Sequence, residues 1–225
     1  DSATGAAVYG VGGGITCDSD PAAEYAEAMA KAAVLTASSP DFELFETLRL
    51  ENGVYALNER HQERLLGSAA YFDRPADPAQ IADALDSVAR KHPSGVWRVR
   101  LVLAKSGIAR AECAALAMQA EGLLLVALAR SPISRHDRFL HHKTTHRAAY
   151  AERRSEFPDL FDALLWNEEG ELTEFTIGNL VVEIDGGLWT PPRECGLLGG
   201  VARAEMLAQG RIAERALVKS DLAAA

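Results

Sequence analysis

The chain has 225 residues, enough for one large domain or two smaller ones with a substantial hydrophobic core. Its formal net charge of −9 argues against a nucleic-acid partner, because binding to phosphates relies on clustered Lys and Arg. No apolar run approaches the roughly 20 residues of a membrane span, so no membrane association is expected. Cys17, Cys113 and Cys195 form neither a disulfide framework nor a metal spacing, and no secretory signal is visible. We therefore expect a cytoplasmic protein.

The first part of the chain is predicted to be a short glycine-rich arm and one helix. Glycines crowd residues 10–14, and the helix is expected from Pro21 to Leu35. Small residues and a proline follow in Thr36–Pro40, which is typical of a linker. We accordingly divide the chain into residues 1–38, 39–132 and 133–225.

The second segment is predicted to mix strands and helices. An extended run from Phe42 to Leu50 leads into Asn52-Gly53, a pair that favours a tight hairpin, and Val54–Leu57 returns. Asn58 is expected to cap a helix that reaches Phe72. Asp77, before Pro78, is expected to cap another that ends near His92.

Two further strands are expected in this segment. In Val96–Ala104, apolar residues alternate with arginines, the period of a strand with one buried face. Leu123–Ala129 is the longest apolar run, and we expect Leu123–Arg130 to form a buried strand beside Val96–Ala104. The tryptophans at positions 97, 166 and 189 are interpreted as core residues on strands. The combination predicts an α+β fold.

The third segment is predicted to be a compact β unit between two helices. The first helix is expected from Arg147 to Glu156, before Pro158. The last begins after Gly199-Gly200 and ends near Gly210. Between them we expect four short strands, at Ala163–Asn167, Leu172–Phe175, Leu180–Ile184 and Leu188–Thr190.

Lys143 and Glu174 are the most informative pair of residues. Lys143 lies in the run Phe139–Arg147, and Glu174 follows 31 positions later. A lysine amine can bind an aldehyde, and a carboxylate can pair with a pyridinium nitrogen. Together they are the minimum set of side chains that chemistry with pyridoxal 5'-phosphate (PLP) requires.

The sequence from Phe42 onward resembles the class IV (fold-type IV) PLP enzymes, which include branched-chain and D-amino-acid aminotransferases and aminodeoxychorismate lyase. Five stretches in the family's order support this resemblance: Phe45–Arg49, His61–Leu65, His142–Arg147, Leu172–Glu174 with Asn179, and Gly196–Arg203. The resemblance implies a two-domain fold like that of D-amino-acid aminotransferase, with a smaller N-terminal α/β sandwich and a β-barrel-like C-terminal domain. It also implies a homodimer.

Within the family, three stretches are most similar to aminodeoxychorismate lyases: the residues around Lys143, Ala163–Asn167 and Trp189–Pro192. Residues 1–38, with Glu24 and Glu27, resemble the last segment of aminodeoxychorismate synthase component I. The resemblance therefore implies a fusion, with the synthase components as partners. For this segment we favour a solvated helix with a glycine arm over a binder of magnesium or chorismate.

The resemblance assigns a role to each matching residue. Lys143 would bind the cofactor aldehyde through its amine and later act as the general base. Glu174 would keep the ring nitrogen protonated. Arg64 would bind the cofactor phosphate together with the backbone N–H groups of Val201 and Ala202 at a helix N-terminus.

Other matching residues are expected around the cofactor and the substrate. Asn179 and Thr176 are placed near the phosphate or the ring, and Thr47 faces the substrate carbon. Arg147 is the expected cationic neighbour of Lys143. Arg147, Arg49 and Arg100 are candidates for binding substrate carboxylates. The alternative for these residues is an ordinary structural role, in a turn, in a salt bridge or on a sheet surface.

No metal site is expected. The histidines at positions 141, 142 and 146 fit no standard zinc spacing, and we interpret them as solvated loop residues.

The leading function implied by the resemblance is a lyase that converts 4-amino-4-deoxychorismate to 4-aminobenzoate and pyruvate in folate biosynthesis. Two alternatives stay open: a class IV amino-acid aminotransferase, and a non-catalytic interaction domain of a broken fusion. The third depends on a departure from the family, because relatives continue beyond Ser220–Ala225 through another helix and a segment near the substrate.

Overall fold

The computed structural model describes residue 4 and residues 8–33, 40–116 and 122–223. The chain divides into two units, residues 1–41 and 42–225. The first contains the helix α1 (Pro21–Ala33), whose first backbone N–H groups donate to the Asp20 carboxylate. None of its residues is buried. The predicted end of this helix at Leu35 and the linker residues 36–39 lie outside the described residues.

The second unit begins with a four-stranded antiparallel sheet in the order β2-β1-β3-β4. Its strands are β1 (Leu44–Glu51), β2 (Val54–Tyr55), β3 (Val96–Leu103) and β4 (Ala109–Ala115). Asn52 and Gly53 both have positive φ, at 49° and 80°, as a two-residue hairpin requires. The predicted hairpin is confirmed.

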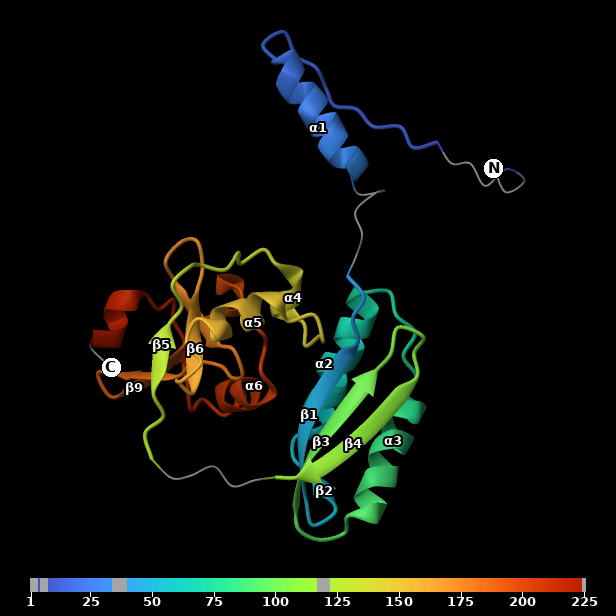
Figure 1. Ribbon diagram of the computed structural model, residues 1–225, viewed down its shortest axis with the longest axis vertical. Helices are drawn as coiled ribbons and strands as arrows, with labels where there is room; N and C mark the ends of the chain where they lie inside the picture. The colour runs from blue at the N-terminus through green and yellow to red at the C-terminus, as the bar shows by residue number, and fades with distance from the viewer. Residues whose placement is uncertain (1–3, 5–7, 34–39, 117–121, 224–225) are drawn as a thin grey trace. The chain divides into compact units, whose positions relative to one another are not determined.

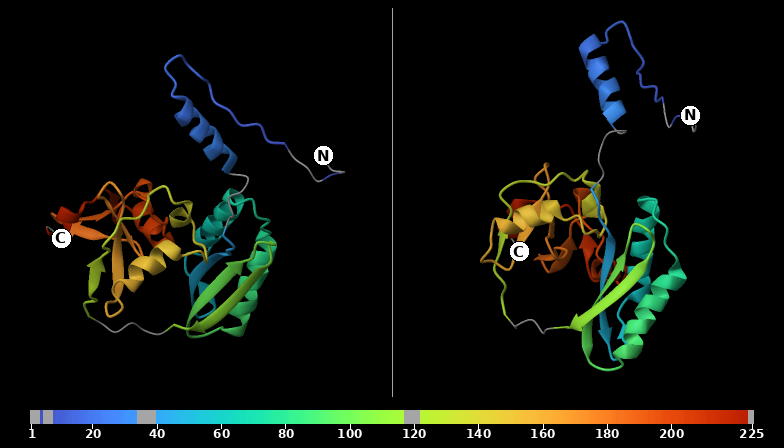
Figure 2. Two further views of the ribbon diagram at one scale, coloured as in Figure 1. Left: turned by 45° about the horizontal axis from the view of Figure 1, so that its top comes forward. Right: turned by 45° about the vertical axis from the view of Figure 1, so that its right-hand side comes forward.

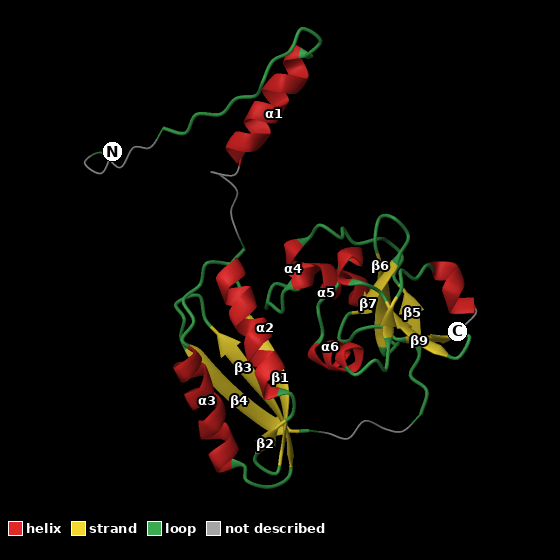
Figure 3. Ribbon diagram, turned by 180° about the vertical axis from the view of Figure 1, so that it is seen from behind, coloured by secondary structure: helices red, strands yellow, loops and turns green. Residues whose placement is uncertain are grey.

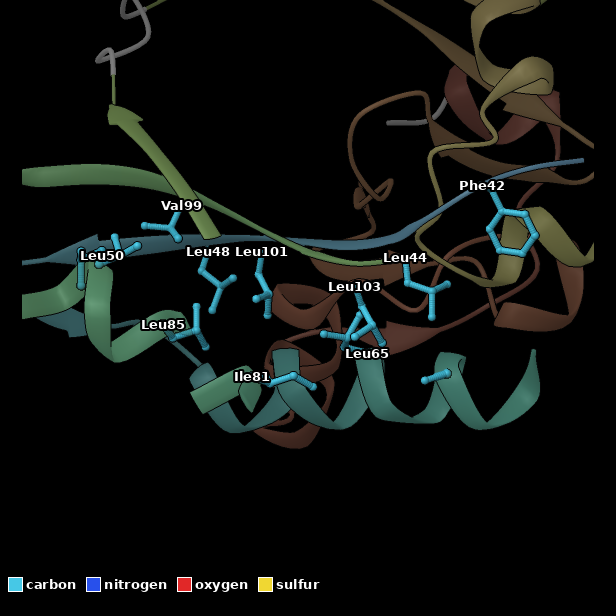
Figure 4. Packing of buried hydrophobic residues seen from close by; sticks show 12 residues of the cluster. Phe42, Leu44, Leu48, Leu50, Leu65, Ile81, Leu85, Val99, Leu101 and Leu103 are labelled. Carbon is cyan, nitrogen blue, oxygen red and sulfur yellow. The ribbon is translucent and has the colours of Figure 1, made fainter. Parts of the chain in front are cut away.

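Two helices, α2 (Asn58–Tyr71) and α3 (Pro78–Lys91), cover one face of this sheet (Figures 1 and 3). Leucines of β1 and β3 point toward Leu65 of α2 and toward Ile81 and Leu85 of α3 (Figure 4). These side chains are almost completely buried and form the core of this half. The other face of the sheet is not covered by these two helices.

The two predicted helix caps have different outcomes. Asp77 caps α3 as expected, since its Oδ1 accepts from the Ala79 N–H at 2.9 Å. The cap predicted at Asn58 is wrong. Leu57 occupies the N-cap position of α2 in a left-handed conformation, without a side-chain cap, and Asn58 is the first helical residue.

The strand expected beside β3 is not the apolar run 123–130. β3 lies between β1 and β4, and β4 was not predicted because its alanines and charged residues form only a weak apolar pattern. A short connection through Gly107 joins β3 to β4, and short loops cost less closure entropy than long ones. A strand does form inside this run, at Val126–Leu128, but the run is not buried as expected, because Leu123 is fully exposed and Leu125 is 72% exposed.

The remainder of the unit contains two three-stranded sheets. Figure 2 shows this part of the chain, coloured from yellow to red, in two further views. In one, β6 (Asp162–Trp166) lies between β5 (Val126–Leu128), which is parallel to it, and the antiparallel β7 (Leu172–Phe175). In the other, β9 (Gly187–Thr190) lies between β8 (Val182–Ile184) and β10 (Ala213–Glu214). The helices are α4 (Arg138–His141), α5 (Ala148–Ser155) and α6 (Val201–Ala208), with 3₁₀ turns at Arg193–Cys195 and Lys219–Ala223.

This arrangement confirms the α+β class, because runs of strands and runs of helices follow one another along the chain and most neighbouring strands are antiparallel. The three tryptophans lie on strands as expected, but each is only partly buried and packs at the margin of a core. Among the described helices, none is long and apolar enough to cross a membrane.

Candidate active site

Backbone hydrogen bonds attach the segment that contains Lys143 to the first strand of the first sheet, β1. The N–H of Phe45 on β1 donates to the Lys143 carbonyl at 3.0 Å. The Thr145 N–H donates to the Glu43 carbonyl at 2.9 Å, and Thr144 forms a bridge with Leu44. Residues 143–145 thus extend the sheet for a short distance, and the Lys143 ammonium lies 4.9 Å from the centre of the Phe45 ring.

A cavity of about 490 Å³ opens at this place. It is lined by most of the residues that the sequence analysis selected: Lys143, Glu174, Arg64, Arg147, Asn179, Thr176, Thr47 and Arg100. Two separate halves of the unit contribute these side chains, from β1, β3 and α2 on one side and from the segment 143–200 on the other. Lys143 and Glu174 therefore line the same cavity.

The environment of Lys143 favours a neutral amine. Burial lowers the pKa of its ammonium to about 8, and the positive charges of Arg64 and Arg147 act in the same direction. Glu46 and Glu174 oppose this shift only in part. The effect of Arg64 exceeds that of Arg147, the neighbour expected from sequence. A lysine with such a pKa is partly neutral near physiological pH, as a nucleophile or general base must be.

Glu174 is buried, at 4% exposure, and three groups donate to its carboxylate. The Tyr150 hydroxyl and the Leu198 N–H donate to Oε1 at 2.7 and 3.0 Å, and the Asn179 amide donates to Oε2 at 3.1 Å. Burial nevertheless raises the pKa of the carboxyl to about 7. An additional cationic donor in the cavity would stabilise its ionised form.

Arg64 is fixed in position by Glu46. Burial opposes ionisation of Glu46, but hydrogen bonds from Arg64 and His61 outweigh it and lower the pKa of the carboxyl. The Arg64 Nη1 atom also donates to the Gly199 carbonyl at 2.9 Å. These contacts place the guanidinium beside the N-terminus of α6.

The residues directly before α6, Leu198 and Gly200, line the cavity. Gly200, the N-cap of α6, lies so close to Asn179 that an added Cβ would be 1.8 Å from the amide oxygen. Val201 and Ala202 follow as the first helical residues, where backbone N–H groups have no partner within the helix. Their side chains do not line the cavity, so any contribution comes from the backbone.

Of the remaining candidates, Thr176 lines the cavity and Arg49 does not. The Thr176 hydroxyl donates to the buried Asp162 at 2.5 Å, and the Thr176 carbonyl accepts from Arg147. Thr176 therefore shapes the wall without offering its hydroxyl. Arg49 is not brought to the cavity, since it lies farther along β1 and pairs with Glu51 at 3.0 Å.

Three residues at the site were missed by the sequence analysis: Tyr150, Glu46 and Arg98. Tyr150 follows Lys143 by seven residues and reaches Glu174 only through the fold. Glu46 lies in the stretch Phe45–Arg49, but no local feature of the sequence indicates that it is the buried partner of Arg64. Arg98 alternates with Val99 in the same way as Arg100, and this signal could have identified it.

The histidine predictions are partly wrong. His142 is partly buried. Its Nδ1 atom forms a hydrogen bond of 2.9 Å with the Ser68 hydroxyl, and its ring packs against Tyr71 and Phe72. Burial lowers its pKa to about 4, so it is neutral at physiological pH. Throughout the described ranges, no three His, Cys, Asp or Glu side chains form a group that could hold a metal ion.

In the first unit, the two carboxylates of interest already have partners. Glu27 pairs with Lys31 at 2.6 Å, and Glu24 accepts from the Ser19 hydroxyl at 2.8 Å.

Residues 43–225 match the family described as amino-transferase class IV. The chain belongs to this family. Its members are PLP enzymes, and the α+β architecture of residues 42–225 is the fold-type IV aminotransferase-like fold. Residues 2–37 match a second family, described as chorismate binding enzyme.

Solved structures agree with the family. A protein from Mesorhizobium loti, provisionally named an amino-acid aminotransferase, is 38% identical with a TM-score of 0.75, covering 82% of this chain and 91% of its own. The 4-amino-4-deoxychorismate lyase of Pseudomonas aeruginosa is 22% identical with a TM-score of 0.66, covering 80% and 75%. A hypothetical aminotransferase from Mycobacterium tuberculosis, in a PLP-bound form, is 21% identical with a TM-score of 0.67, covering 80% and 73%. No curated protein matches the chain.

The residues of this class IV enzyme fit the cofactor of its family. PLP has an aldehyde, a basic ring nitrogen and a phosphate. The cavity has a partly neutral lysine, a buried carboxylate, and an arginine beside the uncapped N-terminus of a helix. Each chemical group of PLP thus has a complementary group in the protein.

Proposed function

We propose that this chain is a PLP-dependent lyase that converts 4-amino-4-deoxychorismate to 4-aminobenzoate and pyruvate. The observation that supports PLP chemistry is the shared cavity of Lys143 and Glu174. The observation that selects this substrate is the chorismate-binding match directly ahead of the class IV domain.

Four groups would hold the cofactor. Lys143 would bind its aldehyde, Glu174 its ring nitrogen, and Arg64 its phosphate together with the N–H groups of Val201 and Ala202. When bound, PLP supplies an electron sink for the carbon next to the substrate nitrogen. Burial of Glu174 matters because a carboxylate in a low-dielectric site interacts strongly with a ring cation.

Lys143 is also the base of the proposed reaction. Its amine removes the proton from the ring carbon that carries the substrate amino group. Loss of the neighbouring enolpyruvyl group then makes the ring aromatic, and the departing group becomes pyruvate. Because the pKa of Lys143 is about 8, its amine can accept this proton near neutral pH.

The opposite wall of the cavity suits a substrate with two carboxylates. Arg98 and Arg100 lie on one face of β3, two residues apart and therefore about 7 Å apart along the strand. Arg64 and Arg147 donate to protein oxygens, whereas neither Arg98 nor Arg100 forms a salt bridge among the described residues. Arg100 lies over the Phe45 ring, 4.1 Å from its centre, and its charge acts on Glu43 only at longer range. 4-Amino-4-deoxychorismate carries one carboxylate on its ring and one on its side chain.

A fusion with aminodeoxychorismate synthase component I would explain the first unit. The matched segment covers residues 2–37, and α1 exposes Tyr25 and Met29, at 69% and 51%. Most of the stability of a protein helix comes from packing an apolar face, and α1 has no buried residue. We propose that α1 packs against the synthase domain, and that the enzyme acts as a homodimer in the cytoplasm.

The second candidate is an amino-acid aminotransferase, and it is favoured by the 38% identity to the Mesorhizobium loti protein. Both reactions use the same lysine and the same cofactor. They would differ in where Lys143 returns the proton and in whether an enolpyruvyl group leaves the substrate.

One assay separates the two candidates. The protein with PLP is supplied with chorismate, ammonia and an added synthase, and the fluorescence of 4-aminobenzoate is followed. In parallel, transfer of an amino group to keto acids is measured. We expect 4-aminobenzoate without keto-acid dependence. Amino transfer without 4-aminobenzoate would replace the lyase with the aminotransferase, and failure to take up PLP would contradict both.

A further inference from the structure

The carboxylate of Glu174 is held unevenly by its three donors. Oε1 accepts two hydrogen bonds, from the Tyr150 hydroxyl at 2.7 Å and the Leu198 N–H at 3.0 Å. Oε2 accepts one, from the Asn179 amide at 3.1 Å. Each carboxylate oxygen offers two lone pairs. Oε1 is therefore saturated, whereas Oε2 can still accept one more hydrogen bond.

We propose that Tyr150 is a positioning residue that occupies Oε1 of Glu174, so that Oε2 is the atom left to bind the ring N–H of a pyridine cofactor. This inference rests on the proposed PLP-dependent function. It assigns a role to a side chain that no motif in the sequence indicated.

The surroundings of Tyr150 support this role. The side chain lies on α5, the helix that follows the Lys143 segment, and is only 6% exposed. Its hydroxyl therefore connects the lysine-bearing segment to the carboxylate on β7. Asn179 is fixed in turn, since its amide also donates to the Leu198 carbonyl at 2.8 Å. The carboxyl plane is thus fixed by donors from three segments of the chain and cannot rotate without losing a contact.

The charge state of the pair is consistent with donation from the phenol. Burial raises the pKa of Tyr150 well above its ordinary value, so the hydroxyl keeps its proton. Arg147 covers the Tyr150 ring at 4.1 Å and, with Lys143, favours the ionised form of Glu174. Hydrogen bonds from Tyr150 and Leu198 act in the same direction against burial. Removing the phenol would leave a carboxyl that binds a proton more readily and a ring cation less well.

The test compares PLP with its 1-deaza analogue, in which a carbon replaces the ring nitrogen. Dissociation constants for both are measured on the full chain, for wild type, Tyr150→Phe and Tyr55→Phe. Tyr55→Phe is the matched control, because the Tyr55 hydroxyl also donates one hydrogen bond, to the Leu85 carbonyl at 2.8 Å, far from the cavity lining.

We expect Tyr150→Phe to bind PLP about tenfold more weakly, since hydrogen bonds to charged groups contribute more than neutral ones. Its affinity for the 1-deaza analogue should stay unchanged, because that compound has no ring N–H for Oε2. Tyr55→Phe should leave both affinities unchanged.

Several results would overturn the inference. Equal weakening of both ligands in Tyr150→Phe would mean a general structural role, and no weakening would mean no role. If Tyr150→Phe does not fold, wild type still decides the Oε2 contact, because equal affinity for PLP and the 1-deaza analogue contradicts it. Absence of PLP binding to wild type would instead overturn the proposed function, and the inference with it.

Discussion

Glu46 and Arg64 form a two-point ion pair beneath the candidate active site. The Arg64 Nε and Nη2 atoms donate to the two carboxylate oxygens at 2.8 and 2.5 Å, and the Glu46 side chain is only 1% exposed. Because Arg64 is the proposed phosphate ligand, its orientation depends on this buried partner. The paired arrangement presents a fixed guanidinium to the cavity.

Glu46→Gln should destabilise the protein by about 3 kcal/mol, because it leaves a largely buried guanidinium without its counter-charge. Urea unfolding of the cofactor-free protein measures this change. The control is Glu43→Gln, which breaks another two-point pair, with Arg110, but at the surface, where such pairs contribute less than about 1 kcal/mol. Equal losses in both variants would contradict a special role for burial at Glu46.

Glu174→Gln should change how stability depends on pH. The pKa of Glu174 is raised from 4.5 to about 7, so native and unfolded states are both protonated at low pH and both ionised at high pH. Between these limits the native state binds more protons, and wild type loses stability as pH rises through the window. Glutamine does not titrate. The free energy of unfolding of the cofactor-free variant, relative to that of wild type, should therefore increase by on the order of 3 kcal/mol between pH 4.5 and a pH above 7.

Unfolding by urea at several pH values tests this expectation. Glu112→Gln, at an exposed position on β4, serves as the control and should show a constant difference from wild type. A difference for Glu174→Gln that is also constant with pH would mean that the carboxyl is not buried as the structure shows.

Arg98→Met and Arg100→Met should weaken binding of the two-carboxylate substrate, each by roughly tenfold in KM, since each removes one charge-assisted contact. Arg49→Met is the matched control, because Arg49 lies on the same sheet but outside the cavity and pairs with Glu51. The initial rate of 4-aminobenzoate formation measures the effect. A loss in Arg49→Met equal to that in Arg98→Met would place the substrate elsewhere on the sheet.

Gly200→Ala should impair PLP binding, because the new Cβ would displace Asn179 and with it the contact to Glu174 Oε2. Gly67→Ala is the contrast. Gly67 is within α2 and has nothing within 4 Å of an added Cβ, so alanine should stabilise the helix by up to about 1 kcal/mol. Absorbance titration with PLP, together with thermal unfolding, distinguishes the two. Unchanged PLP affinity in Gly200→Ala would show that Asn179 is not needed where it lies.

The local parts of the fold could be predicted from sequence because their signals are local. Asn52-Gly53 specifies a hairpin through its backbone preferences, and Asp77 before Pro78 specifies a helix start. The pairing of β4 with β3 could not be predicted in this way. Apolar periodicity identifies a strand only when one face is strongly hydrophobic, and β4 is rich in alanine and charge.

The site shows the same division. Lys143 and Glu174 were identified by residue type and motif, and the structure places both at one cavity. Tyr150, Glu46 and Arg98 were not identified, because their roles depend on which distant side chains the fold brings next to them. A buried carboxylate that orients an arginine is indistinguishable in sequence from an exposed one.

The central claim is that Lys143 binds the aldehyde of PLP, and reduction with borohydride tests it most directly. Wild type, Lys143→Ala and Lys105→Ala, the last at an exposed turn, are incubated with PLP near pH 8, reduced, digested and mapped by mass spectrometry. We expect a stable pyridoxyl label on the peptide that contains Lys143 in wild type and Lys105→Ala, and none in Lys143→Ala. Stoichiometric labelling of Lys143→Ala, with a wild-type label at another lysine, would contradict the account.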